Sequence, residues 1–168
     1  MKKPRLAALI ASAAAALVVL TAPACSGDDD DASRQDEIAQ KGAAVMPFDL
    51  DKTHHTFEQD DKGGVESVRA LDPKDSAQIG LIRSHLQLEA TKFAAGDFSD
   101  PTAIHGTAMP GVAALSAGAK ADRLTIEYAE LPNGAKITYV SEDPVLVAAI
   151  HDWFNAQVSD HGQHASSN

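Results

Sequence analysis

Apolar and polar residues alternate in two stretches of the chain, residues 53–73 and residues 123–144. A turn-forming sequence interrupts each stretch, Lys-Gly-Gly at 62–64 and Pro-Asn-Gly at 132–134. Alternation with a period of two is typical of half-buried strands, and Gly-Gly or Asn-Gly between two such strands favours a tight turn. The pattern therefore predicts two β-hairpins.

After each hairpin the apolar residues recur at a spacing of three or four, which is typical of an amphipathic helix. We expect the first helix within residues 74–96 and the second within residues 145–162. An Asp-Pro pair stands directly before each of them, where aspartate can cap free backbone N–H groups and proline suits the first helical position. Hairpin and helix thus form a ββα unit that occurs twice.

Residues 97–123 join the two units and contain a short predicted helix at 110–118. A sheet with one apolar face is stable only when a second layer covers that face. The expected fold class is therefore α+β, with duplicated ββα units that form a four-stranded antiparallel sheet and with helices on one face. Residues 46–160 are expected to form this single domain, which is long enough for one hydrophobic core.

The N-terminal residues have the pattern of an export signal. Lys2, Lys3 and Arg5 precede an apolar run, and small residues precede Cys25, so residues 1–24 are predicted to be a signal peptide. The sequence Ala-Pro-Ala-Cys resembles the lipobox of bacterial lipoproteins, in which the cysteine is acylated. It also satisfies a simple Ala-x-Ala cleavage site, which would leave a secreted or periplasmic protein without lipid. We expect lipidation of Cys25, the only cysteine, and hence an exported protein anchored on the outer face of the cell membrane.

The segments on either side of the domain are polar. Residues 25–45 are acidic and rich in small side chains, so they are predicted to form a disordered tether behind the lipidated cysteine. Residues 161–168 are expected to be a polar tail.

Acidic side chains dominate the charge of the protein. The whole chain has a formal net charge of −10, and removal of the signal peptide leaves 24 acidic and 11 basic side chains. Nucleic acid is an unsuitable partner for such a surface, because phosphate binding needs clusters of lysine and arginine. A cation is electrostatically favoured, although acidity can also serve solubility alone.

Seven histidines provide most of the candidate metal ligands. They are His54, His55, His85, His105, His151, His161 and His164. Imidazole suits zinc, copper and iron, and the thioethers of Met46 and Met109 suit Cu(I).

Three combinations place these ligand types close together. His85 and Glu89 are four residues apart on a predicted helix and share one face, which fits half a metal site or an ordinary hydrogen-bonded pair. His105 and Met109 stand on either side of a flexible glycine, and their alternative roles are a helix cap and a core filler. His55 shares the inward face of a strand with apolar residues and needs a buried partner, which can be a carbonyl group, a carboxylate or a metal.

The sequence lacks the motifs of several enzyme classes. It has no G-x-S-x-G, no H-E-x-x-H, no glycine-rich phosphate loop and no C-x-x-C-H for covalent haem. It therefore gives no set of catalytic residues, and we do not expect an enzyme.

Three stretches, 48–73, 82–111 and 131–162, resemble a family of bacterial exported proteins that often carry the label "aspartate carbamoyltransferase". Members of this family can have C-terminal tails with histidine and methionine, whereas the tail of this chain has no methionine. The transferase of that name is a larger two-domain enzyme with a Ser-Thr-Arg-Thr loop for carbamoyl phosphate. That loop does not occur here, so we do not expect the named activity.

These patterns lead to one functional hypothesis and one alternative. The hypothesis is a membrane-anchored extracytoplasmic lipoprotein that binds a transition metal, copper, without catalysis. Its expected ligands are His85, His105 and Met109, supported by Glu89 and His55. The alternative is a small envelope module that docks a protein partner through its sheet and whose histidines are purely structural.

Overall fold

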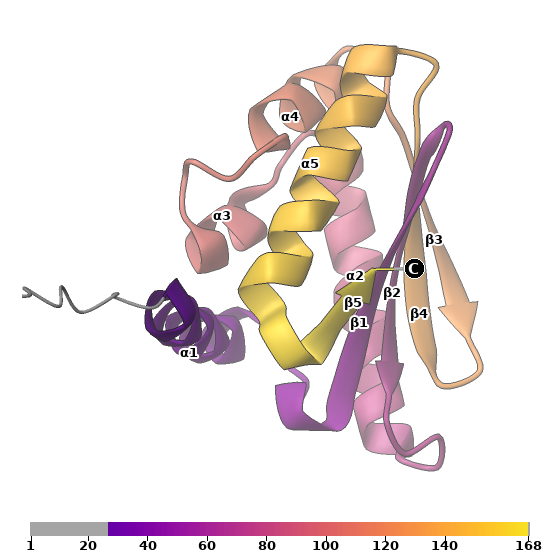
Figure 1. Ribbon diagram of the computed structural model, residues 1–168. Coiled ribbons are helices and arrows are strands. Elements are labelled where there is room, and N and C mark those ends of the chain that lie inside the picture. Colours follow the sequence, from indigo (N-terminus) through magenta and orange to yellow (C-terminus); the bar gives the residue numbers. More distant parts are fainter. Residues whose placement is uncertain (1–26, 168) are drawn as a thin grey trace, which may run out of the picture.

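The computed structural model describes residues 27–167 and has the α+β fold expected from the sequence (Figure 1). Its strands are β1 (Thr53–Asp60), β2 (Gly63–Ala70), β3 (Thr125–Leu131), β4 (Gly134–Val140) and β5 (Ala165–Ser167). Its helices are α1 (Gly27–Val45), α2 (Ser76–Ala94), α3 (Ser99–His105), α4 (Val112–Lys120) and α5 (Pro144–His161). Two short 3-10 turns, η1 (Leu50–Lys52) and η2 (Gly162–His164), precede β1 and β5.

Both predicted hairpins are present and lie side by side in one sheet. β1 pairs with β2 and β3 pairs with β4, and the two hairpins join through antiparallel pairing of β2 with β4, where Val68 lies opposite Ala135. Each hairpin is followed by its helix, α2 or α5, so the ββα unit occurs twice.

The expectation of four antiparallel strands was incomplete, because the sheet has five strands in the order β3-β4-β2-β1-β5 and is mixed. β5 belongs to the predicted polar tail and pairs in parallel with β1, with Ala165 opposite His55. The backbone hydrogen bonds of an edge strand do not require apolar side chains, so the alternation that revealed the other strands is absent here. The turn η2 brings this segment back to the sheet after α5 ends.

α2 and α5 cover one face of the sheet and enclose the core (Figure 1). α2 packs on β3 and β4, and α5 packs on β1 and β2. The largest fully buried side chains include those of Trp153, Tyr139, Phe57, Phe154 and Ile82. Burial of such aromatic and branched side chains is the main source of stability of a domain of this size.

Aspartates cap α2 and α5, but one of them is not the predicted residue. At the start of α5, Asp143 accepts a hydrogen bond from the backbone N–H of Val145 at 2.9 Å, as expected. At the start of α2 the cap is Asp75, which accepts from the N–H of Gln78 at 3.1 Å. Asp72 instead accepts from the N–H of Lys74 in the preceding turn, at 2.9 Å, so α2 begins later than the Asp-Pro pair suggested.

Two helices and a glycine turn connect the halves of the fold. α3 and α4 lie in the predicted insertion, and α4 begins at Val112 rather than at residue 110. Gly111 has a φ of 76°, and a Cβ atom there would lie 2.0 Å from the backbone oxygen of Ala149 on α5. A glycine is required here because any side chain would clash with α5.

The predicted disordered tether is wrong for residues 27–45, which form α1. Ile38 is buried, with 2% of its surface exposed, and α1 packs against α3 and α5. Ile38 is the one large apolar residue in the middle of α1, which gives too weak a periodicity to predict this docking. The ion pair of Arg34 with Asp160 joins residues 126 positions apart. Cys25 and the predicted signal peptide lie outside the described residues. In residues 27–167 no helix is long and apolar enough to cross a membrane.

Candidate functional site

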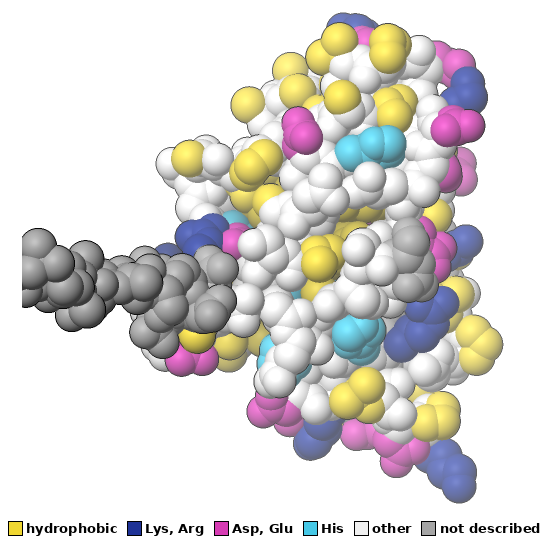
Figure 2. Space-filling model, in the orientation of Figure 1, with side chains coloured by type: hydrophobic (Ala, Val, Ile, Leu, Met, Phe, Trp, Pro, Cys, Tyr) yellow, Lys and Arg dark blue, Asp and Glu magenta, His cyan; other side chains and the backbone are white. Residues whose placement is uncertain are grey.

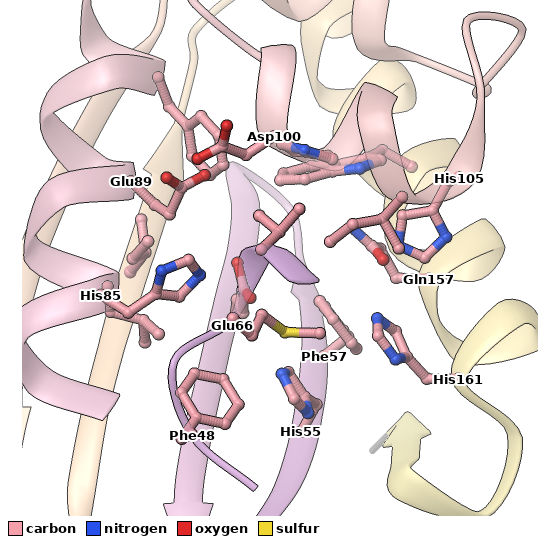
Figure 3. A pocket seen from close by; sticks show the side chains of 18 residues that line it. Phe48, His55, Phe57, Glu66, His85, Glu89, Asp100, His105, Gln157 and His161 are labelled. Atoms are coloured by element: carbon pink, nitrogen blue, oxygen red, sulfur yellow. The ribbon is translucent and has the colours of Figure 1, made fainter. Parts of the chain in front are cut away.

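A cavity of about 50 Å³ lies between the sheet and the helices, and it is lined by residues from nearly every element of the core (Figure 3). Its polar lining consists of His55, Glu66, His85, Glu89, Asp100, His105, Gln157 and His161. Its apolar lining consists of Val45, Met46, Phe48, Phe57, Leu86, Phe93, Pro101, Ile104, Ile137 and Trp153. The space exceeds the roughly 15 Å³ that one water molecule needs, so a few water molecules or a single ion fit in it.

Four of the seven histidines line this cavity, and each comes from a different element. His55 is on β1, His85 on α2, His105 at the end of α3 and His161 at the end of α5. The other three histidines have partners elsewhere in the described structure. His151 has its Nε2 3.0 Å from the carbonyl oxygens of Asp60 and Gly63. Figure 2 shows histidine side chains at several places on this face of the molecule. His54 and His164 lie near polar groups of other segments.

Three of the four imidazole rings form a continuous wall, which we name the imidazole wall (His55, His105 and His161). The ring centres of His55 and His161 are 5.0 Å apart with nearly parallel planes, at 9° to each other. The ring centres of His105 and His161 are 5.1 Å apart, and these planes are inclined at 73°. His161 therefore stands between the other two rings.

A buried carboxylate holds one ring of the imidazole wall. His105 Nδ1 lies 2.8 Å from Asp160 Oδ2, and Arg34 donates two further hydrogen bonds to the same carboxylate at 2.6 Å each. Burial raises the pKa of Asp160, but the hydrogen bonds from Arg34 and His105 outweigh this effect and leave the pKa below its usual value. Asp160 is therefore ionised at neutral pH and accepts a hydrogen bond from His105 Nδ1–H.

Burial keeps the imidazole wall uncharged. It lowers the pKa of His55 well below its usual value, and nearby histidines add to this effect. Burial, with His105 next in effect, lowers the pKa of His161 to about 3. The pKa of His105 is also lowered by burial, although Asp160 opposes this. Neutral imidazoles have a free nitrogen lone pair, which is the form that binds metals.

The opposite side of the cavity contains carboxyl groups, and Figure 3 shows Glu89 and Asp100 side by side above His85. Burial, and then a hydrogen bond with Asp100, raises the pKa of Glu89 to about 8. Burial also raises the pKa of Glu66 to about 7, although Tyr139 Oη donates a hydrogen bond to Glu66 Oε2 at 2.9 Å. At neutral pH this side therefore retains carboxyl protons.

Unsatisfied polar atoms concentrate in this cavity. In the described residues, four buried side-chain atoms have no hydrogen-bond partner: His55 Nδ1, Glu89 Oε1, Trp153 Nε1 and Gln157 Oε1. All four residues line the cavity. A buried polar atom without a partner costs about 1–3 kcal/mol, so this cavity is the place in the described core where a bound ligand gains most.

The structure brings together four of the five side chains that the sequence singled out as metal ligands. His55, His85, Glu89 and His105 line the cavity, whereas Met109 does not. Met109 is buried at 7% exposure and borders a separate surface hollow together with His105. The thioether in the cavity lining is that of Met46.

Sequence reasoning missed three important residues of this region, all on α5. Trp153, Gln157 and His161 are spaced by four residues, so they occupy one face of the helix and all line the cavity. This spacing was the available signal, but His161 was placed in the polar tail because glycine and polar residues follow it.

The cavity is not a preformed metal centre. Among the residues that the structure describes, no three histidine, cysteine, aspartate or glutamate side chains converge as metal ligands do. Metal binding would require side-chain rotation, chiefly of the parallel rings of His55 and His161.

No protein-family model, no curated protein and no solved structure matches the chain. The resemblance of the sequence to a family of exported proteins therefore stays a prediction, and the cavity is the feature that indicates a function.

Proposed function

We propose that the protein is an extracytoplasmic, membrane-anchored lipoprotein that binds one transition-metal ion, copper, without catalysing a reaction. The ion is held in the cavity by the imidazole wall, with His55, His105 and His161 as ligands. Compared with the ligand set expected from the sequence, His55 and His105 remain and His161 is added, whereas His85, Glu89 and Met109 do not belong to this site.

The spacing of the three rings is the observation that carries this proposal. Two imidazoles that bind one metal ion at about 2.0 Å, with tetrahedral angles, have ring centres about 5 Å apart. The successive ring centres of the imidazole wall are 5.0 and 5.1 Å apart. Two pairs of rings therefore already have the centre spacing of metal-bound imidazoles, and side-chain rotation is still needed to direct all three nitrogen atoms to a common point.

The hydrogen bond between His105 and Asp160 supports the same function. Histidines that bind metals commonly donate their second ring N–H to a carboxylate, which fixes the tautomer and makes the other nitrogen a better ligand. Here Asp160 accepts from Nδ1, so Nε2 of His105 carries the lone pair.

Copper is favoured over zinc by the soft atom near the histidines. Met46 lines the same cavity, and thioethers bind Cu(I) much better than zinc. The export signal and Cys25 support the assignment outside the cytoplasm, and both rest on the sequence alone.

The test is metal-dependent thermal stability of the purified protein in a Cys25→Ser background, which removes the only competing thiol. At about 100 times its dissociation constant, a ligand stabilises the native state by about 2.7 kcal/mol, which raises Tm by at least about 5 °C. We expect Cu(I) to produce this rise in the parent protein and in the control variant His151→Ala. We expect no rise in His105→Ala and His161→Ala, whose metal-free Tm is measured first.

Trp153 gives a second readout, because it is the only tryptophan of the chain and lines the cavity. Paramagnetic Cu(II) bound there should quench its fluorescence at one equivalent, whereas Zn(II) should not. If copper changes neither Tm nor fluorescence, the proposal is wrong and the docking of a protein partner becomes the better account.

A further inference from the structure

The side of the cavity opposite the imidazole wall contains a second set of ligand atoms, which we name the carboxylate wall (His85, Glu89 and Asp100). His85 and Glu89 are one helical turn apart on α2, and Asp100 comes from the first turn of α3. Phe48 stands between the two walls, with its ring centre 5.6 Å from that of His85 and 5.9 Å from that of His55. Phe48 therefore separates the two walls of the cavity.

The two carboxyl groups of this wall lie close together, because the ammonium group of Lys92 contacts both of them. Burial, and then Asp100, raises the pKa of Glu89 to about 8, whereas at Asp100 the effect of burial is outweighed by Lys92 and Glu89, which lower the pKa. Two neighbouring carboxylates that cannot both ionise can be stabilised by one proton or by a cation between them.

A positive charge already lies against this pair. The ammonium group of Lys92 forms an ion pair with Asp100, and its Nζ lies 3.4 Å from Glu89 Oε1. That longer contact does not satisfy Glu89 Oε1, which has no hydrogen-bond partner. The side chain of Lys92 is 27% exposed, whereas that of Glu89 is 6% exposed. A cation in place of the ammonium group would therefore contact a carboxyl group that is shielded from water.

We infer that the carboxylate wall is a second cation site, selective for a divalent ion of the manganese or zinc class, with Glu89, Asp100 and His85 as ligands once their side chains rotate to face one point. Two carboxylates and one imidazole are a ligand set for borderline and hard divalent ions, whereas the imidazole wall suits a soft ion. This site lies beyond the proposed copper function and does not depend on it.

Binding at this site balances charge in a defined way. The ion replaces the proton of the Glu89 carboxyl group, which goes to solvent, and the Lys92 ammonium group moves outward toward water. His85 is the neutral member of the set, because burial lowers its pKa, although Asp100 opposes this. The other ionisable groups facing this end of the cavity are Glu66 and, behind it, Tyr139.

The probe for this inference is Mn²⁺, whose free-ion electron paramagnetic resonance signal disappears on binding. We expect one bound Mn²⁺ per chain at pH 8, with affinity at least about tenfold weaker in Glu89→Gln and in Asp100→Asn. The control Glu58→Gln removes an exposed carboxylate of β1 and should bind Mn²⁺ as the parent protein does.

Lys92→Met is an independent test if the carboxyl variants fold poorly. Loss of the competing ammonium group should tighten Mn²⁺ binding about threefold or more. No Mn²⁺ binding by the parent protein and by Lys92→Met would overturn the inference. Equal affinity of Glu89→Gln and the parent protein would do the same.

Variants of the imidazole wall separate this result from the copper proposal. His161→Ala should keep its Mn²⁺ affinity while it loses the response to Cu(I). If His161→Ala abolished Mn²⁺ binding, the two walls would form one site and the inference of a separate carboxylate site would be wrong.

Discussion

His105 Nδ1 lies 2.8 Å from Asp160 Oδ2, and both side chains are buried. This contact fixes the tautomer of the imidazole, because the ionised carboxylate can only accept and Nδ1 must carry the proton. Arg34 of α1 donates hydrogen bonds to both oxygens of the same carboxylate. The helix nearest to the predicted membrane anchor therefore takes part in orienting a proposed metal ligand.

The variant Asp160→Asn tests the role of this carboxylate. A neutral amide oxygen would accept a weaker hydrogen bond and leave the charge of Arg34 uncompensated, so we expect the affinity for Cu(I) to fall about 10- to 100-fold. Competition titration with a Cu(I) chelator measures this change. Asp152→Asn, an exposed change on the same helix, is the control and should leave affinity unaltered.

Loss of Arg34 should release α1 from the domain. Arg34→Ala removes both hydrogen bonds from Arg34 to Asp160, which is only 6% exposed, and leaves this carboxylate with His105 alone. We expect limited proteolysis within residues 32–45 to become at least about tenfold faster, because local opening then costs less free energy. Lys41→Ala removes an exposed pair with Glu37 on the same helix, and a rate as fast as that of Arg34→Ala would contradict this account.

Acid should destabilise the metal-free protein through the imidazole wall. The pKa of His161 falls from the usual 6.5 to about 3 on folding, so the unfolded chain binds more protons between these values. This stabilisation is present above pH 6.5 and is lost as the pH falls toward 3. Urea denaturation in the presence of a chelator should therefore show stability falling below pH 6.5.

The variant His161→Gln should reduce this acid dependence. By pH 4 we expect it to have lost at least about 1 kcal/mol less of its neutral-pH stability than the parent protein. His164→Gln, in the following turn, is the matched control. An unchanged acid dependence in His161→Gln would show that this ring is not responsible.

Glu66 should change the pH dependence of folding stability in the opposite direction. Burial raises its pKa from the usual 4.5 to about 7, so the folded state holds a proton that the unfolded chain has lost. Its stabilising contribution is present below pH 4.5 and is lost as the pH rises through 7.

Glu66→Gln keeps an oxygen that can accept from Tyr139 Oη and remains neutral at all pH values. We expect its unfolding free energy to match that of the parent protein near pH 5 and to exceed it at pH 8 by on the order of 2 kcal/mol. Urea denaturation at both pH values measures this, with Glu58→Gln as the exposed control. Equal stability of Glu66→Gln and the parent protein at pH 8 would refute the buried-carboxyl explanation.

The sequence predicted the parts of the fold that local patterns encode. Both hairpins, α2 and α5 follow from apolar periodicity and turn residues, and the α+β class follows from their order. β5 was not predictable in this way, because it is held by backbone bonds to β1 and has polar side chains. α1 was missed because its docking depends on Ile38 and on the distant pair of Arg34 with Asp160.

The candidate site was predictable in composition but not in geometry. His55, His85, Glu89 and His105 were identified from residue type and spacing, and they do line one cavity. Which of them face each other depends on how α2, α3 and α5 pack, which no local pattern contains. For this reason His161, at the centre of the imidazole wall, was assigned to the tail.

X-ray absorption spectroscopy of the Cu(I)-loaded Cys25→Ser protein tests the central claim most directly. The account predicts one copper per chain with three nitrogen ligands at about 2.0 Å that show the scattering pattern of imidazole, together with one sulfur from Met46. Loss of an imidazole contribution in both His105→Ala and His161→Ala would place the ion at the imidazole wall. A copper without imidazole ligands, or a protein that retains no copper after dialysis, would contradict the account.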